Sequence, residues 1–216
     1  MRRDSPARPD TRVGKVRIIG GRWRGTRLEV PWIDGLRPSS DRVRETLFNW
    51  LQEQIVGARC LDLFAGSGAL GFEAASRGAR EVVMIERDAR AVAGLRDTAQ
   101  RLQASQVEVV AGDALAWLER RADRQFDLVF VDPPFAAGLH QPVLDRLLPW
   151  LAAEAQVYLE YGPALASPVL AGFAPRREGR TRDARFSLLH RSKGLPVPGA
   201  PATLEPTSGA GPASRT

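Results

Sequence analysis

The chain has 216 residues and a hydrophobic content of 44%, which is enough for one full-sized domain with a buried core. It has no run of about 18 apolar residues, no apolar N-terminal stretch and a single cysteine, so we expect a cytoplasmic protein without a membrane span, a secretory signal or an internal disulfide. The net charge of +6, carried almost entirely by arginine, favours nucleic acid as the partner, although solubilising surface arginines would give the same total.

The N-terminal region is predicted to hold a flexible basic arm followed by a β-hairpin. Residues 1–15 are polar and rich in proline and arginine, which is typical of mobile arms. Between Val16 and Val30, two short apolar stretches flank the glycines of GGRWRG, which predicts a hairpin within residues 16–36. The candidate RNA-binding residues of this hairpin are Arg22, Trp23 and Arg24. An aromatic residue between two basic residues suits RNA binding, because its ring can stack on a nucleobase, although burial of Trp23 explains the pattern equally well.

Arginines gather in two parts of the chain. One group lies in the arm and the hairpin, and the other lies near the end of the domain: Arg176, Arg177, Arg180, Arg182 and Arg185. A charge concentrated at two places is typical of a binding face.

A helix is predicted to begin at Asp41. Pro38 ends the hairpin region, and residues 39–41 offer side chains that can cap a helix N-terminus. The apolar face of this helix is predicted to contain Val43, Leu47, Trp50 and Leu51.

From Arg59 onward, short strands alternate with helices. The strands are predicted from RCLDLF, EVVMIE, VEVVAG, FDLVFV and AQVYLEY, with two more within 173–190 and a helix over about 139–151. This alternation predicts a doubly wound, Rossmann-like α/β fold, in which helices cover both faces of a mostly parallel sheet and the ligand binds at the carboxyl ends of the strands. Residues 37–192 would form this core, and the Pro/Gly/Ala/Ser-rich residues 193–216 a disordered tail.

A glycine-rich loop follows the first of these strands. Gly66, Gly68 and Gly71 match G-x-G-x-x-G, whose glycines let the backbone approach a ligand closely. The helix N-terminus behind the loop suits the carboxylate of S-adenosylmethionine or the pyrophosphate of a dinucleotide, and a turn that binds nothing is the alternative. Asp62 favours S-adenosylmethionine, because its carboxylate can meet the methionine amino group and NAD has no cation there.

Two further acids follow the next two strands. Glu86 can accept hydrogen bonds from both ribose hydroxyls of an adenosine, or it can serve only as a charge near a helix N-terminus. Asp113 can reach an adenine edge, or it can be an ordinary N-cap. The predicted cofactor residues are Asp62, Phe64, Gly66, Gly68, Glu86, Arg87, Asp113 and Ala114.

The motif with the clearest chemistry is DPPF, after the fourth strand. The amino group of a base is a poor nucleophile, because its lone pair is delocalised into the ring. The Asp132 carboxylate and the Pro133 carbonyl can accept its two hydrogens, orient the nitrogen and stabilise the charge that develops on it. Pro134 stiffens the loop, and Phe135 offers a ring for stacking on the base. The alternative is a Pro-Pro turn after a buried strand.

No metal site is predicted. His140 and His190 lie far apart and have no partners at metal-ligand spacing. We expect His140 to be a solvated loop residue and Cys60 to fill space in the core.

Taken together, these motifs resemble a known family. DLFAGSGALGFEAASRGA, VVMIERD, GDAL and VDPPF resemble the class I methyltransferases that act on amino nitrogens. VRIIGGRWRGTRLEVP and RPSSDRVRETLFNWL are more particular, and with the other motifs they resemble the RsmD family of bacterial 16S rRNA guanine-N2 methyltransferases. The resemblance runs from about Val16 to about His190.

The resemblance implies a methyltransferase domain over 16–192 with a seven-stranded sheet and an N-terminal hairpin that helps to hold RNA. It implies S-adenosylmethionine as cofactor and, as substrate, a guanine of 16S rRNA within the small-subunit particle, with ribosomal proteins nearby. It also places Arg37 near the site. We expect a monomer.

Other functions stay open on the residues alone. An NAD-dependent oxidoreductase would use the glycine loop and Glu86, but it leaves DPPF and the arginine clusters unexplained. A non-catalytic RNA-binding protein is a further alternative, but it would not explain why the glycine loop, the acids at the strand ends and DPPF occur together. Transfer to adenine N6 of DNA or RNA, or to glutamine N5 of a protein, uses a motif of the same kind, and only the N-terminal resemblance selects rRNA guanine.

Overall fold

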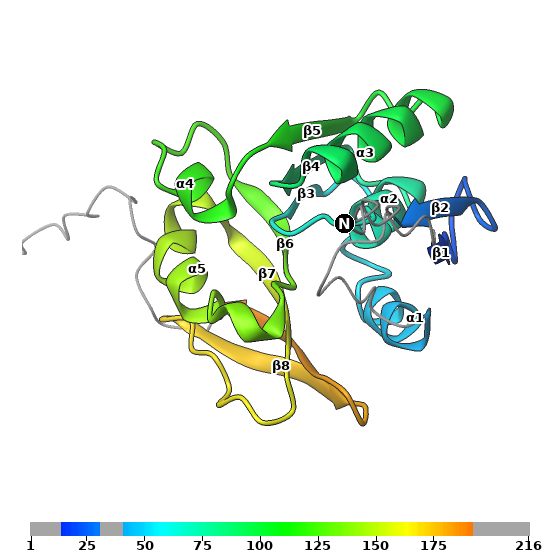
Figure 1. Cartoon of the computed structure of the whole chain (residues 1–216). Helices are drawn as coiled ribbons and strands as arrows, with labels where there is room; N and C mark the ends of the chain where they lie inside the picture. The colour runs from blue at the N-terminus through cyan, green and yellow to red at the C-terminus, as the bar shows by residue number, and fades with distance from the viewer. Residues whose placement is uncertain (1–13, 31–40, 192–216) are drawn as a thin grey trace, which may run out of the picture.

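The computed structural model describes residues 14–30 and 41–191. The predictions for the rest of the arm, for Arg37 and for the tail lie outside these residues. The elements in chain order are β1 (Gly14–Arg17), β2 (Arg27–Val30), α1 (Asp41–Trp50), β3 (Arg59–Asp62), α2 (Ala69–Ser76), β4 (Glu81–Glu86), α3 (Ala89–Arg101), β5 (Val107–Ala111), α4 (Ala114–Leu118), β6 (Phe126–Val131), η1 (Phe135–Ala137), α5 (His140–Leu147), η2 (Leu148–Trp150), β7 (Leu151–Tyr161), β8 (Phe173–Arg180) and β9 (Arg185–Arg191) (Figure 1).

The main sheet has seven strands in the order β5-β4-β3-β6-β7-β9-β8. The strands from β5 to β7 are parallel, and β9 pairs antiparallel with both β7 and β8. The order reverses between β3 and β6, so the carboxyl ends of these two strands flank the crevice where doubly wound folds bind ligands. The predicted Rossmann-like α/β fold is confirmed.

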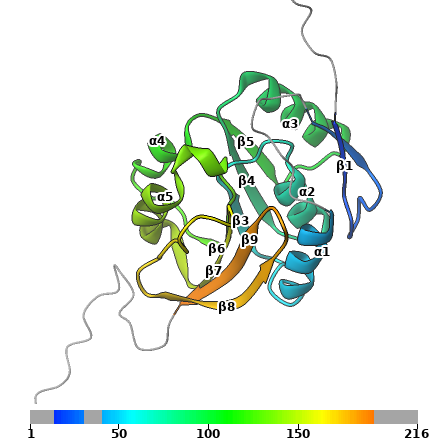
Figure 2. The ribbon, with the colours of Figure 1, turned by 60° about the horizontal axis from the view of Figure 1, so that its bottom comes forward.

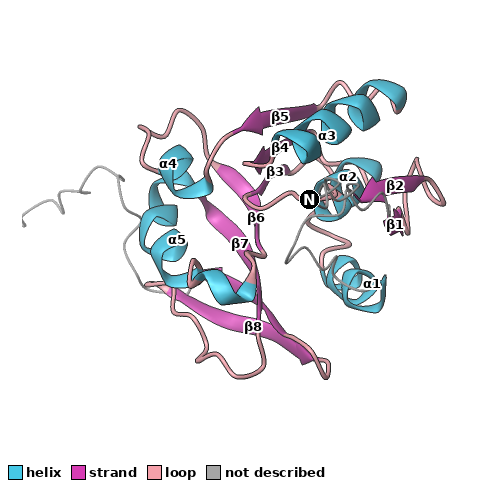
Figure 3. Cartoon of the chain, in the orientation of Figure 1, coloured by secondary structure: helices cyan, strands magenta, loops and turns pink. Residues whose placement is uncertain are grey.

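Helices cover the sheet on both sides. Helices α1, α2 and α3 pack on one face, in a core that includes Phe48, Phe72 and Phe130. Helices α4 and α5 pack on the other face, in a core that includes Trp117 and Trp150. The two groups lie on opposite sides of the strands (Figures 2 and 3). Successive side chains along a strand point to opposite faces of the sheet, so residues two positions apart in a strand belong to the same core.

The N-terminal hairpin forms a separate two-stranded sheet. Strand β1 pairs with β2 from Gly14↔Val30 to Arg17↔Arg27. The predicted arm therefore extended two residues too far, because Gly14 and Lys15 already belong to the hairpin ladder.

Two element boundaries also differ from the prediction. The helix expected over 139–151 is α5 followed by the 3₁₀ turn η2, because Pro149 has no N–H to continue the α-helical pattern. Strand β7 begins at Leu151, four residues before the predicted segment, and an irregularity in its pairing with β6 separates the added residues from the regular register. Helix α1 begins at Asp41, as predicted.

Candidate functional site

Four acidic side chains gather at the carboxyl edge of the parallel strands. Asp62 and Glu86 are the last residues of β3 and β4, Asp113 follows β5 after one glycine, and Asp132 follows β6 directly. Because β5, β4, β3 and β6 are neighbours, their carboxyl ends meet at one edge of the sheet (Figure 1). The fold therefore brings to one edge the four acids that were predicted to bind the cofactor or the target base.

The glycines of the loop after β3 are required by space and by backbone geometry. Gly66 and Gly68 have positive φ angles of 51° and 75°, which L side chains rarely adopt. A Cβ at Gly68 would lie 2.6 Å from Phe72, and a Cβ at Gly71 would lie 2.4 Å from the Met84 Cε. The loop is thus held close to α2 and β4, with its backbone turned toward the carboxyl edge.

Asp62 is a buried carboxylate at the start of this loop. It is 2% exposed, and its Oδ2 accepts a hydrogen bond from the Gly71 N–H at 3.1 Å. Its pKa is raised from 3.8 to about 7; burial is the main cause, hydrogen bonds from the Gly71 and Phe64 N–H groups partly oppose the rise, and the nearby Glu86 adds to it. A cationic group beside Asp62 would reverse this rise, so the site is suited to a positively charged ligand atom.

Glu86 fastens the end of β4 to the glycine loop. Its Oε2 accepts from the Gly66 N–H and its Oε1 from the Asp88 N–H, each at 2.8 Å. A carboxylate offers about four lone-pair sites, so both oxygens can also accept from ligand hydroxyls. The loop and the acid predicted to bind a ribose are therefore held as one unit.

The other predicted cofactor residues line the same edge in different environments. Asp113 is exposed and caps α4, its Oδ1 accepting from the Leu115 and Ala116 N–H groups at 2.9 and 3.1 Å. Ala114 is buried, Phe64 is partly buried against the second core, and Arg87 is exposed. The N-cap role of Asp113 is confirmed, and its contact with an adenine stays a prediction.

The DPPF motif forms a tight loop between β6 and α5. Asp132 is partly buried, Pro133 is buried and Pro134 is exposed, with φ −53° and ψ 124°. Phe135 begins the short turn η1, and its ring lies against Gly162 just after β7, where a Cβ would come within 3.4 Å. The motif therefore continues a buried strand into a stiff loop that reaches over the end of β7.

His140 differs from its prediction. It is 5% exposed at the start of α5, and its Nε2 lies 2.9 Å from the Glu160 carbonyl oxygen. Burial lowers its pKa, so the imidazole is neutral near pH 7. The expectation of a solvated loop histidine is wrong, because α5 begins here and buries the ring at the end of β7.

The hairpin presents its two arginines but buries its tryptophan. Arg22 and Arg24 are exposed. Trp23 is 8% exposed and belongs to the core beneath the hairpin, and its backbone N–H donates to the Ser76 Oγ at 2.9 Å. We therefore assign Trp23 to the core and correct its predicted stacking role.

A buried ionic cluster anchors the hairpin, and sequence analysis missed it. The Glu73 side chain is fully buried and accepts from the Ile19 and Gly20 N–H groups at 2.6 and 2.8 Å and from the Arg77 Nε at 2.7 Å. The fully buried Arg44 lies 3.8 Å from Glu73 and donates to the Arg17 carbonyl at 3.0 Å. A glutamate inside the apolar helix segment GFEAAS was the available signal.

The second arginine group is divided between the turn and the middle of the β8–β9 hairpin. Tyr161, the last residue of β7, pairs with Arg185, so the turn between β8 and β9 lies at the carboxyl edge. The Arg185 guanidinium lies 5.4 Å from the centre of the Tyr161 ring. Arg180, Arg182 and Arg185 are exposed in or beside this turn.

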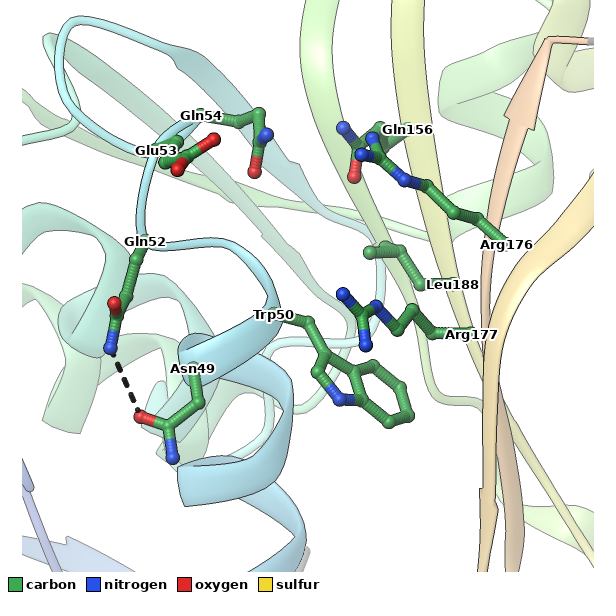
Figure 4. Close-up of a pocket in the computed structure, with 9 residues that line it drawn as sticks. All are labelled: Asn49, Trp50, Gln52, Glu53, Gln54, Gln156, Arg176, Arg177 and Leu188. Carbon is green, nitrogen blue, oxygen red and sulfur yellow. Dashed lines mark hydrogen bonds between the residues drawn. The ribbon is translucent and has the colours of Figure 1, made fainter.

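Arg176 and Arg177 lie in the middle of β8. They line an open pocket with Trp50, Gln156 and Leu188, between the end of α1 and the β8–β9 hairpin (Figure 4). This pocket lies near the start of the regular β6–β7 pairing, away from the four acids.

Residues 14–30 and 41–191 contain neither a cluster of metal ligands nor a membrane-spanning helix. No group of three or more histidine, cysteine or acidic side chains there could hold a metal ion. None of the described helices is long and apolar enough to cross a bilayer. Cys60 is fully buried in β3 and fills space in the core, as expected.

Comparison with known proteins identifies the family. The family model described as "Conserved hypothetical protein 95" matches residues 16–189. Ribosomal RNA small subunit methyltransferase D of Escherichia coli (strain K12) is 49% identical over 149 residues, which cover 68% of this chain and 75% of that protein. Its namesake in Haemophilus influenzae is 45% identical over 152 residues, with 68% and 79% covered. The solved structure of yhhF from Escherichia coli has a TM-score of 0.76 and 42% identity, and the match covers 82% of this chain and 98% of that one. The chain belongs to the family of ribosomal RNA small subunit methyltransferase D, the RsmD family.

Proposed function

We propose that this protein transfers the methyl group of S-adenosylmethionine to the exocyclic N2 amino group of a guanine in 16S rRNA of the small ribosomal subunit. The observation that carries the proposal is the meeting of the DPPF loop, the glycine loop and a buried carboxylate at one edge of the sheet. Family membership supports methyl transfer to small-subunit rRNA, and the resemblance of the N-terminal motifs supports guanine N2.

The residues at this edge fit the cofactor. S-adenosylmethionine supplies a methyl group on a positively charged sulfur, together with a methionine amino group, a ribose and an adenine. Asp62 would bind the amino group, because its raised pKa marks a buried carboxylate that gains from a cation. Glu86 would accept hydrogen bonds from the ribose hydroxyls, and Asp113 from the adenine amino group. Phe64, Gly66, Gly68, Arg87 and Ala114 would complete the pocket.

The DPPF loop would position the amino nitrogen. The Asp132 carboxylate accepts one N2–H and the Pro133 carbonyl the other, so the nitrogen lone pair turns toward the methyl carbon. When the N–C bond forms and the C–S bond breaks, positive charge would develop on the nitrogen, where the Asp132 carboxylate and the Pro133 carbonyl would stabilise it. One N2 proton then leaves, with Asp132 as its first acceptor, and no strong base is needed because the methylated nitrogen is acidic. Phe135 lies at the rim, where its ring can stack on a base taken out of its helix.

Two exposed arginine groups would hold the RNA. Arg22 and Arg24 lie on the N-terminal hairpin, and the turn between β8 and β9 carries Arg180, Arg182 and Arg185 at the same edge as the DPPF loop. Arginines suit phosphate groups, which carry most of the affinity in RNA binding. The substrate would be the rRNA of the small-subunit particle in the cytoplasm, and Arg37 would also contact it.

The test is methyl transfer from labelled S-adenosylmethionine to small subunits from cells that lack this protein, followed by mass spectrometry of the nucleosides. We expect N2-methylguanosine at one position of 16S rRNA. Labelled N6-methyladenosine, or label in ribosomal protein, would refute the choice of guanine. Absence of transfer to subunits and to naked rRNA would refute the proposed function, and the relative affinities for S-adenosylmethionine and NAD would then decide the cofactor.

A further inference from the structure

A buried acid next to the DPPF loop has no role in the reaction described so far. Glu160 is the penultimate residue of β7 and is 6% exposed. The Tyr158 hydroxyl donates to its Oε2 at 2.7 Å. This hydrogen bond fixes the carboxylate at the carboxyl end of β7, close to the loop that follows β6.

The strand register places Glu160 beside Asp132. In the parallel pair of β6 and β7, Phe130 is opposite Tyr158 and Val131 is opposite Leu159, so the next residues in order are Asp132 and Glu160. Phe130 and Tyr158 belong to the same core, and therefore the residues two positions later leave the sheet on that same face. Adjacent strands lie about 4.8 Å apart, which brings the two carboxylates to one small area.

Other contacts support this placement. Burial, then the charges of Glu160 and Asp132, raise the pKa of Tyr158 well above its usual value, so both acids lie near its hydroxyl. The DPPF loop is fastened to the end of β7 at two further points. The His140 Nε2 meets the Glu160 carbonyl oxygen at 2.9 Å, and the Phe135 ring packs on Gly162. The segment that follows the DPPF motif therefore packs against the end of β7 at Glu160 and Gly162.

We propose that Glu160 selects guanine by accepting a hydrogen bond from N1–H of the target base while Asp132 and the Pro133 carbonyl hold N2. This inference rests on the proposed function. The N1–H and N2–H groups of guanine are neighbouring donors on one edge, which two adjacent carboxylates can accept together. Adenine has an unprotonated N1 that a carboxylate repels, so the same site disfavours it. Tyr158 is the positioning residue that holds the Glu160 carboxylate in place.

The first test uses the unaltered protein and a changed base. Small subunits are reconstituted with 16S rRNA that carries either guanine or 2-aminopurine at the mapped target position, and single-turnover methyl transfer is measured. The base 2-aminopurine keeps the amino group but lacks N1–H. We expect transfer to it to be slower by roughly 10- to 100-fold, the range of one well-placed base contact. Equal rates would overturn the inference.

The second test changes the acid. In Glu160→Gln the side chain can still accept from Tyr158, but its amide can donate to the bare N1 of 2-aminopurine. We expect this variant to react more slowly with guanine, and we expect the ratio of the guanine rate to the 2-aminopurine rate to move toward one. Glu154→Gln, at the exposed start of the same strand, is the matched control and should keep the wild-type ratio.

The outcomes separate the claims. An equal loss of rate on both bases in Glu160→Gln would mean that Glu160 only supports the structure, which would overturn the inference. Thermal unfolding and S-adenosylmethionine affinity of the variant show whether it is folded, and the test with unaltered protein needs no variant. Wild-type protein that methylates neither particle would refute the proposed function itself, whereas efficient transfer without discrimination would refute the role of Glu160 alone.

Discussion

Because Asp62 is buried, we predict that the free energy of unfolding of the ligand-free protein falls as pH rises. Its pKa is about 7 in the folded protein, against an ordinary value of 3.8. This difference corresponds to about 4 kcal/mol of folding free energy. At a pH below 3.8 the carboxyl group is protonated in both the folded and the unfolded protein, so it does not lower the free energy of unfolding. Between pH 3.8 and about 7 the Asp62 carboxyl group ionises only in the unfolded protein, so the free energy of unfolding falls as pH rises. Above pH 7 the penalty is constant.

The perturbation is Asp62→Asn, which keeps an acceptor for the Gly71 N–H but removes the charge. Free energies of unfolding are measured by urea denaturation at pH 5 and pH 8 for both proteins without ligand. The wild type should lose about 3 kcal/mol more than the variant between these pH values. The comparison cancels the contribution of His140, whose lowered pKa acts in the opposite direction.

The same residue gives a prediction for the ligand. If the methionine amino group binds the ionised carboxylate, wild-type affinity for S-adenosylmethionine should rise with pH through about 7, and Asp62→Asn should bind weakly with little pH dependence. Calorimetry in buffers of different ionisation enthalpy would also detect release of a proton on binding. Asp97→Asn, an exposed change on α3, is the control. Identical pH dependence of stability in wild type and Asp62→Asn would refute the reasoning.

Three further predictions concern catalysis, RNA and the hairpin. Asp132→Ala should abolish methyl transfer while the affinity for S-adenosylmethionine, measured by calorimetry, stays nearly unchanged; substantial turnover would contradict its positioning role. Replacing Arg22 and Arg24 by glutamine should weaken RNA binding and flatten its dependence on salt, because fewer counterions are released; filter binding at several salt concentrations would show an unchanged slope if the hairpin does not touch RNA. Glu73→Ala should lower the free energy of unfolding by about 3–5 kcal/mol in urea titrations, because it leaves Arg77 and the Ile19 and Gly20 N–H groups without their buried acceptor; a loss below about 1 kcal/mol would show that the cluster contributes little.

Those features of the site that depend on local sequence were predictable. Strand-loop-helix order and the acids at strand ends follow from short segments, because parallel strands carry their carboxyl ends to one edge. The role of Glu73 was not predicted and the choice between stacking and burial of Trp23 was left open, because both depend on how the hairpin packs on a helix more than 50 residues away. Glu160 could not be recognised as a neighbour of Asp132 before the register of β6 and β7 was known. His140 was misjudged because its burial depends on packing against the end of β7, where its ring meets the Glu160 carbonyl oxygen 20 residues away.

The anchoring of the N-terminal hairpin sets the conditions for moving it to another protein. Glu73 and Ser76 hold the hairpin backbone and lie on α2, the helix that begins directly after the glycine loop. A graft of residues 14–30 alone would leave behind both of these contacts and Arg44. A transplant that is to keep the orientation of the hairpin must therefore carry α2 and the start of α1 as well, and the glycine loop would travel with them.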